Sequence, residues 1–352
     1  MCSIYYFFCN IVSNISFQLV QICFYSIWMK NNKYLLVIVF SVLFCLQDVF
    51  GQDPTFTQFY ANPLYLNPAF AGTARCARFN ANYRNQWPNL SANYVTYSAS
   101  YDQFFEGISG GIGVLMTHDQ QGSGTINTSM LGLMYSYHLK VSRKSSLIFG
   151  VRAAWYQKFL DWDKLTFGDM IDPRRGFIYA TGDVPRGPSR GFFDASAGAL
   201  FFNQYFFAGV AVHHLNMPDE SIIKGVKSRL PMRYTAHAGA EIKLGAASKY
   251  ANPVSIMPNV IFQYQQGFME INVGTYIKYN IFTAGAWFRN KDAFILTMGL
   301  NTGGFRLGYS YDVTVSKLNN NNSGGSHEVS LGYTIPCKKK SRQWRTISCP
   351  SF

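Results

Sequence analysis

Residues Arg78–Trp87 read RFNANYRNQW, and polar and apolar side chains alternate along this stretch. The polar positions are Arg78, Asn80, Asn82, Arg84 and Gln86, and the apolar ones are Phe79, Ala81, Tyr83 and Trp87. Successive side chains of a β-strand point to opposite faces of the sheet. The stretch therefore predicts a strand with one polar face and one apolar face.

The same alternation recurs through most of the remaining chain. Fourteen segments show it, at residues 78–87, 94–102, 108–116, 126–138, 147–158, 192–202, 205–213, 232–242, 257–264, 269–279, 281–289, 293–300, 304–313 and 327–335. Most of them approach the ~9 to 11 residues that a tilted membrane-spanning strand needs. An even number of strands places both ends of a bacterial barrel in the periplasm.

The connections between these segments differ in length. Long polar connections, such as 159–191, 214–231 and 315–326, follow odd-numbered segments. Short ones, such as 203–204 and 301–303, follow even-numbered segments, although residues 243–256 form a long exception. Outer-membrane barrels have short periplasmic turns and longer extracellular loops, so the asymmetry favours a barrel over a soluble β-sandwich.

The composition agrees with a membrane barrel. Of the 352 residues, 17% are aromatic and only 14% are charged, whereas an ordinary globular domain has about 25% charged residues. After residue 51, no uninterrupted apolar run reaches the ~20 residues that a membrane-spanning helix needs. We expect an all-β fold: a transmembrane antiparallel β-barrel of fourteen strands with an N-terminal plug-like segment. A β-sandwich or propeller is the soluble alternative.

The plug-like segment is residues 52–73, QDPTFTQFYANPLYLNPAFAGT. Pro54, Pro63 and Pro68 forbid a continuous helix or strand ladder, because proline lacks an N–H donor and restrains the residue before it. The segment is nevertheless too apolar for a solvated linker. Its plug candidates are Phe56, Phe59, Tyr60, Pro63, Asn67 and Pro68. The alternative is an irregular arm packed on a core.

The N-terminal residues predict that the protein is exported. Lys30 and Lys33, an apolar run from Tyr34 and a small-residue site at Gly51 have the order of a signal peptide. We therefore expect residues 1–28 to be a mis-assigned start and 29–51 a signal peptide. The plug-like segment follows at 52–73, the outer-membrane barrel at 74–336 and a basic periplasmic tail at 337–352.

The distribution of charge and the spacing of the cysteines argue against two classes of function, nucleic-acid binding and metal binding by cysteine. The net charge is +13, but the cations are scattered singly through the expected strands. Nucleic-acid binding is disfavoured because it needs a contiguous basic face. Cys76, Cys337 and Cys349 have no metal-binding spacing; Cys337 and Cys349 could form a small tail disulfide, or all three remain free thiols.

No catalytic, cofactor or metal site is expected. The adjacent His213 and His214 end a segment, so one is expected to face the lumen and the other lipid or an interface. The luminal polar candidates are Arg78, Arg84, Arg152, Arg233, Glu241 and Arg306. In one interpretation they pair with one another and with carbonyl groups of the plug-like segment, which gives every polar group of the interior a partner. In the other they bind a segment of a partner protein.

Several motifs resemble the PorP/SprF family of type IX secretion system outer-membrane proteins of Bacteroidota. They are QDPxFxQFY and NPAFAGT within 52–73, YRNQW at 83–87, TYSASYD at 96–102, KLxFGD at 164–169, HLNxP at 214–218, GAWFR at 285–289 and GYSYD at 308–312. The resemblance implies a barrel of the fatty-acid-transporter-like class. It also implies a secreted cargo partner carrying a type B C-terminal domain, including gliding adhesins.

The resemblance supplies no catalytic residues or cofactor. We expect contact with periplasmic secretion machinery and with outer-membrane lipid, and the scattered cations argue against nucleic acid as a partner. Cargo contact is expected on the long loops, with Asp169, Asp172, Arg174, Arg175, Asn216 and Pro218 as candidates. The alternatives are a channel or transporter for small or hydrophobic solutes, and a purely architectural barrel.

Overall fold

The computed structural model describes residues 53–142, 144–172, 174–182, 187, 189–244, 254–290, 292–315 and 323–337. Residues 166–181 belong to one compact unit, and the rest, from Pro54 onward, belong to another. The expected signal peptide, the segment before it and most of the basic tail lie outside the described residues. Those expectations remain predictions.

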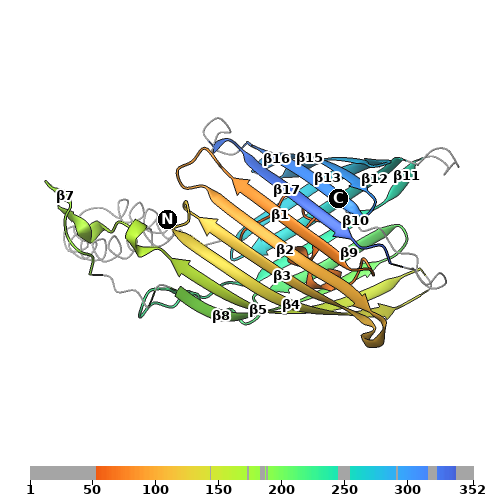
Figure 1. The fold of residues 1–352 in the computed structure, drawn as a ribbon, viewed down its shortest axis with the longest axis horizontal. Helices are drawn as coiled ribbons and strands as arrows, with labels where there is room; N and C mark the ends of the chain where they lie inside the picture. Colours follow the sequence, from red (N-terminus) through yellow and green to blue (C-terminus); the bar gives the residue numbers. More distant parts are fainter. Residues whose placement is uncertain are drawn as a thin grey trace, which may run out of the picture. The chain divides into compact units, whose positions relative to one another are not determined.

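The larger unit is a closed antiparallel β-barrel of fourteen strands, as predicted (Figure 1). Its strands are β1 (Arg78–Gln86), β2 (Tyr94–Phe105), β3 (Gly110–Gln121), β4 (Ile126–Lys140), β5 (Ser146–Leu160), β8 (Ser189–Phe202), β9 (Phe206–His213), β10 (Arg233–Ala240) with β11 (Ile242–Leu244), β12 (Val254–Gln265), β13 (Phe268–Tyr279), β14 (Phe282–Arg289), β15 (Ala293–Thr302), β16 (Phe305–Thr314) and β17 (Ser326–Thr334).

Two pairings close the ring. The first strand pairs with the last over its whole length, from Arg78 opposite Thr334 to Gln86 opposite Ser326. On the other side β10 pairs with β12. β11 continues β10 in the same register, because Gly239 lies opposite Asn259 and Ile242 opposite Ile256. β10 and β11 are therefore one barrel strand interrupted at Glu241.

The wall separates apolar from polar side chains. In β1 the exposed outer positions include Phe79 and Tyr83, while Arg78 and Arg84 are buried on the inner face. Outer positions of other strands, such as Trp155, are likewise large, apolar and exposed. Such an outer surface suits contact with lipid. In the part of the chain that the structure describes, no helix has the length and apolar content to cross a membrane.

The long connections gather at one end of the barrel, as predicted, although this end also carries the short turns 266–267 and 290–292. At the long-loop end lie the connections β5–β8 (161–188), β9–β10 (214–232) and β16–β17 (315–325). At the short-turn end, β13 and β14 are joined by residues 280–281 and β15 and β16 by 303–304, whereas 245–253 form the long exception. Within 166–181, β6 (Ile171–Asp172) pairs with β7 (Gly176–Phe177) in a small hairpin.

One disulfide crosses the seam between the first and last strands. Cys76, just before β1, is bonded to Cys337, just after β17, with 5.7 Å between their Cα atoms. The alternatives of a Cys337–Cys349 bridge and of free thiols at Cys76 and Cys337 were wrong. Pairing of β1 with β17 brings together residues 261 positions apart, which spacing along the chain could not reveal.

Candidate functional site

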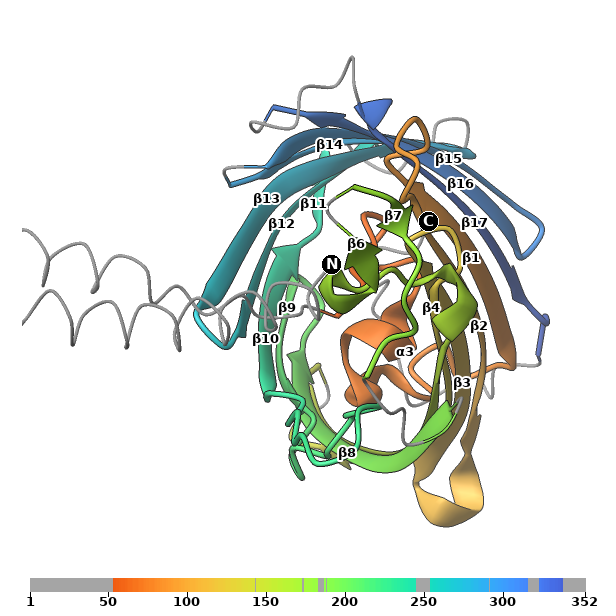
Figure 2. The ribbon, with the colours of Figure 1, turned by 90° about the vertical axis from the view of Figure 1, so that its left-hand side faces the viewer.

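The interior of the barrel is occupied by residues 54–73, here called the arm. Figure 2 views the barrel end-on and shows α3 (Pro63–Leu66) within the ring of strands. Pro63 opens this short helix, a position where a missing N–H costs nothing. Asn67 then begins the 3₁₀ turn η1 (Pro68–Phe70) by accepting the backbone N–H of Ala69 at 2.9 Å. Prolines and a capping asparagine thus shape the arm locally.

All six plug candidates are buried: Phe56, Phe59, Tyr60, Pro63, Asn67 and Pro68. Their aromatic rings pack on different strands of the wall. Phe59 lies 5.1 Å from the ring of Trp287 on β14, and Tyr60 lies 5.5 Å from Phe207 on β9. The apolar part of the arm is therefore covered by inward-facing wall residues.

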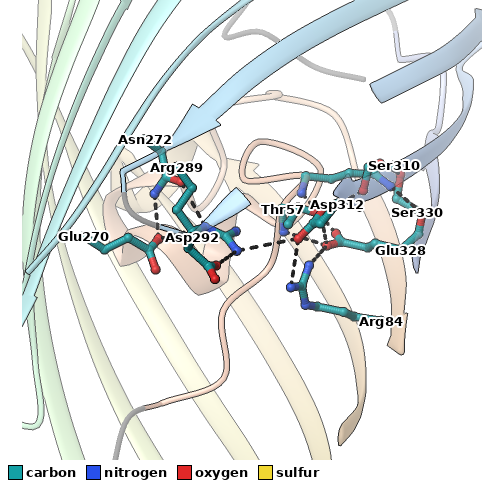
Figure 3. A network of polar contacts seen from close by, with 11 residues as sticks. Thr57, Arg84, Glu270, Asn272, Arg289, Asp292, Ser310, Asp312, Glu328 and Ser330 are labelled. Carbon is teal, nitrogen blue, oxygen red and sulfur yellow. Dashed lines mark hydrogen bonds and ion pairs between the residues drawn. The ribbon is translucent and has the colours of Figure 1, made fainter. Parts of the chain in front are cut away.

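A network of buried charges anchors the start of the arm (Figure 3). The Glu328 carboxylate on β17 accepts the backbone N–H of Thr57 at 2.6 Å and its hydroxyl at 2.8 Å. The Gln58 amide donates to the Glu328 carbonyl at 2.9 Å. Arg84 lies 3.5 Å from the Glu328 carboxylate and 3.1 Å from that of Asp312. The network ties the arm to β1, β16 and β17.

The same network continues across the wall to β13 and β14. Arg289 lies 3.6 Å from Asp312, 3.6 Å from Glu270 and 3.1 Å from Asp292. Asn272 donates to the Glu270 carboxylate at 2.6 Å. Because charges of both signs alternate, each buried ion has a partner of opposite sign, which a water-poor interior requires.

A second carboxylate anchors the end of the arm. Asp102 on β2 accepts the backbone N–H of Gly72 at 2.8 Å and pairs with Arg78 through two contacts of 2.8 and 3.0 Å. Arg78 also donates to the Phe70 carbonyl at 3.2 Å. On β4, Ser136 donates to the Ala71 carbonyl at 2.7 Å. Wall side chains therefore satisfy backbone groups that the arm's irregular course leaves unpaired.

Asn67 anchors the middle of the arm. Its amide nitrogen donates to the carbonyls of Ala199 and Val210, at 3.2 and 3.1 Å, on β8 and β9. It also lies 3.2 Å from the His237 ring nitrogen, and the His237 ring stacks on Phe70 at 5.3 Å. The arm thus holds polar contacts with strands on both sides of the barrel.

Wall glycines make room for this close approach. A side chain at Gly150 on β5 would collide with the backbone of Pro68 and Ala69. Gly111 on β3 meets the arm in the same way, and a Cβ on Gly72 would lie 2.6 Å from the Gly111 Cα. Backbone therefore packs directly on backbone along this side of the lumen.

The luminal candidates are nearly all where the alternation places them. Arg78, Arg84, Arg152, Arg233 and Arg306 are buried on the inner face. Glu241 instead lies at the break between β10 and β11, 4.0 Å from Lys243. Arg78 contacts the arm backbone, and Arg233 donates to the Tyr65 hydroxyl at 3.3 Å. Among the residues that the structure describes, the candidates therefore pair with the arm and with acidic wall residues such as Asp102 and Asp194, and not with one another as the first interpretation expected.

The acidic partners Asp102, Asp194, Asp312 and Glu328 were not singled out from the sequence. Only the alternation, which puts Asp102 and Asp312 on the polar face of their segments, offers a signal. Nothing in the sequence marks Glu328 as the residue that receives Thr57.

The expectation for His213 and His214 was wrong. Both side chains are buried. His213 lies 3.4 Å from the Leu66 carbonyl, and His214 lies 2.9 Å from the Asp194 carboxylate. β9 ends at His213 and His214 has φ 58°, so the strand alternation no longer sets its direction.

The cargo-contact candidates fall into two loops. Arg174 and Arg175 are exposed at the turn of the β6–β7 hairpin. Asp172 accepts their backbone N–H groups, both at 2.8 Å, and the Tyr179 hydroxyl at 3.0 Å. These bonds, the Arg174 N–H first, lower the pKa of Asp172. Asp169 accepts the Thr181 hydroxyl at 3.0 Å.

In the β9–β10 loop the candidates are used internally. Pro218 is buried. Asn216 accepts the N–H of Ala195 at 3.1 Å and donates to the Phe193 carbonyl at 2.7 Å. It thereby continues the edge of β8 beyond the last residue that pairs with β9.

The arrangement offers no site for metal chemistry in the described residues, where no group of three or more His, Cys, Asp and Glu side chains could hold an ion. What it does is bind polypeptide backbone: carboxylates, guanidinium groups and amides of the wall hold a Pro-broken segment. The bound segment belongs to the same chain.

The barrel has solved counterparts of low similarity. The toluene transporter TbuX of Ralstonia pickettii is 11% identical, with TM-score 0.46, over 78% of this chain and 93% of its own. The CymD monoaromatic hydrocarbon channel is 12% identical, with TM-score 0.43, over 82% and 96%. A Pseudomonas aeruginosa FadL homologue is 12% identical, with TM-score 0.41, over 77% and 93%. The barrel assignment itself rests on the strand pairings.

No curated protein sequence matches the chain significantly. The family described as type IX secretion system membrane protein PorP/SprF matches residues 48–333, which include the arm and all fourteen strands except the last residue of β17. The chain therefore belongs to the PorP/SprF family of type IX secretion system membrane proteins.

Proposed function

We propose that the protein is a non-enzymatic outer-membrane component of the type IX secretion system that receives, translocates or anchors a secreted surface protein. The cargo would carry a type B C-terminal domain, as gliding adhesins do. Family membership supports the link to type IX secretion. The observation that carries the choice of role is the arm, which fills the lumen with the chain's own residues.

A barrel that conducts small solutes needs an open path. Here Thr57, Gln58 and Asn67 of the arm are fully buried between strands. Their partners lie on β17, β8 and β9, so polar contacts hold the arm at several points of the wall. This arrangement favours a role at the barrel's rim over passage of solutes through its lumen.

The long-loop end is the surface proposed for the cargo. With an even number of strands, both chain ends share the opposite, short-turn end, which is periplasmic in bacterial barrels. The loops 161–188 and 214–232 then face the cell exterior. The basic residues that follow Cys337 would lie in the periplasm, where contact with secretion machinery is proposed.

Deletion of the gene, followed by measurement of type IX cargo at the cell surface, tests the proposal. Protease shaving of whole cells with identification of the released proteins should show loss of one cargo, and complementation should restore it. Unchanged surface display of every type IX cargo would refute the proposal. Solute uptake by the intact purified protein in liposomes would instead support the transporter alternative.

A further inference from the structure

In the β9–β10 loop, residues 214–232, the acidic and the basic side chains lie in different places. It contains Asp219, Glu220, Lys224, Lys227 and Arg229 and no other charged residue. Both carboxylates are turned toward the wall: Glu220 lies 2.8 Å from Lys158 of β5, and Asp219 lies 3.7 Å from Arg190 of β8. Each carboxylate is therefore neutralised by a cation of the barrel.

Hydrogen bonds within the loop give it a defined hairpin shape. The backbone N–H of Glu220 donates to the Ser228 carbonyl and that of Leu230 to the Pro218 carbonyl, both at 2.9 Å, so the loop closes as a narrow hairpin. Asp219 also accepts the N–H of Ser228 at 2.9 Å. Ile222 and Leu230 are buried. These contacts fix the hairpin without using the side chains of Lys224, Lys227 and Arg229.

Lys224 and Lys227 lie at the turn of the hairpin, and Arg229 lies next to it, opposite Asp219 on the other strand. Lys224–Arg229 reads KGVKSR, every residue in it is exposed, and Gly225 makes the turn with φ 83°. Within the described part of the chain, Lys224, Lys227 and Arg229 form no ion pair. The five cations of this region, counting Lys158 and Arg190, exceed the two carboxylates by three. We call residues 224–229 the cationic tip.

We propose that the cationic tip binds an acidic segment of a protein partner at the long-loop end of the barrel. This inference rests on the proposed function and adds the chemistry by which the cargo would be recognised. Val226, 44% exposed, lies between the lysines, and a partly apolar surface fits a polypeptide better than a phosphate group.

The loop's anchoring also argues against lipid headgroups. Lys158 belongs to the inward-facing positions of β5, and His214, where the loop starts, contacts Asp194 inside the barrel. The loop is therefore held from the lumen side of the wall and away from the lipid-facing side. Complementary charge at an exposed rim mainly accelerates association and depends on salt.

The first experiment uses the full-length protein in nanodiscs of neutral lipid, with fluorescent poly-L-glutamate as probe. We expect binding that weakens as salt rises from about 50 to 500 mM, because screening shortens the reach of exposed charges. The variant K224Q/K227Q/R229Q should bind about ten-fold more weakly at low salt. The control K140Q/K144Q, which removes two lysines at the β4–β5 turn of the opposite end, should bind like the wild type.

Equal binding by the wild type and the triple variant would overturn the inference. So would charge-dependent binding that requires anionic lipid in the nanodisc, which would assign the tip to headgroups. The second experiment measures cargo display in cells. Cargo lost on gene deletion but displayed normally by the triple variant would refute the acidic-segment inference alone, whereas display unaffected by deletion would refute the proposed function.

Discussion

The Glu328 carboxylate accepts the backbone N–H of Thr57 at 2.6 Å, although the two residues are 271 positions apart. Glu328 lies on the last strand of the barrel and Thr57 near the start of the arm. The same carboxylate lies 3.5 Å from Arg84 on the first strand. One side chain thus joins the arm to both strands of the barrel seam.

Replacing this carboxylate should loosen the barrel. We expect Glu328→Gln to lower the free energy of unfolding by about 3–5 kcal/mol, because it leaves the buried Arg84 with one fewer counter-charge. Urea titration of the purified protein in detergent measures the change. Asp163→Asn, at an exposed position of the β5–β8 connection, is the control. The double variant R84Q/E328Q should lose less than the sum of the single losses; strict additivity would show that the pair is not coupled.

A larger residue at Gly150 should displace the arm. We expect Gly150→Val to expose residues 54–73 to protease in the folded barrel, because the added side chain occupies the position of the Pro68–Ala69 backbone. Mass spectrometry of the fragments locates the cuts. Ala153→Val, on the outer face of the same strand, should leave the arm protected. Continued protection in Gly150→Val would mean that the wall yields instead of the arm.

Removing the arm should open the lumen. We expect a variant lacking residues 54–72 to form a barrel that conducts ions in planar bilayers, while the intact protein conducts little. Circular dichroism confirms that the variant keeps its strands. A folded variant that remains closed would reduce the arm to a packed segment with no plugging role.

The seam disulfide should stabilise the barrel. We expect C76S/C337S to lower the free energy of unfolding by about 2–5 kcal/mol, since the bond closes a long loop of the unfolded chain. Adding a reductant should shift the wild-type urea midpoint to that of the variant and leave the variant unchanged. A wild-type midpoint insensitive to the reductant would contradict this prediction.

The hairpin at 171–177 should depend on an ionised Asp172. Its pKa is lowered by the Arg174 N–H and the Tyr179 hydroxyl. The stabilisation is therefore complete above the ordinary carboxyl pKa of 3.8 and is lost as pH falls through the lowered value. Asp172→Asn imitates the protonated form at neutral pH. We expect several-fold faster trypsin cleavage after Arg174 or Arg175, with Asp163→Asn, in an exposed position of the same connection, as the unchanged control.

Much of the wall could be predicted from the chain alone. Each of the fourteen alternating segments corresponds to a strand of the barrel, and most of the long connections fall at one end, which also carries the short turns 266–267 and 290–292. Alternation is a local property, because the backbone of a strand turns successive side chains to opposite faces whatever its neighbours are. The prolines likewise broke the arm into the short elements observed at Pro63–Leu66 and Pro68–Phe70.

The alternation failed where the backbone left the strand conformation. One of His213 and His214 was expected to face lipid or an interface, but the φ of 58° at His214 turns that side chain toward Asp194, and both are buried. Of the two cargo-contact candidates in the β9–β10 loop, Pro218 is buried, whereas Asn216 is exposed and also continues the edge of β8. Loop conformation depends on contacts with the wall, which the loop's own sequence does not contain.

The sequence by itself determined the strands, their two faces and the broken course of the arm, because these depend on neighbouring residues. Tertiary structure alone decided which groups meet: Cys76 with Cys337, Thr57 with Glu328, and the loop carboxylates with Lys158 and Arg190. The physical reason is that these contacts form only when the barrel closes. Pairing β1 with β17 brings distant residues together, and only then does each buried ion or backbone group find the partner that its burial requires.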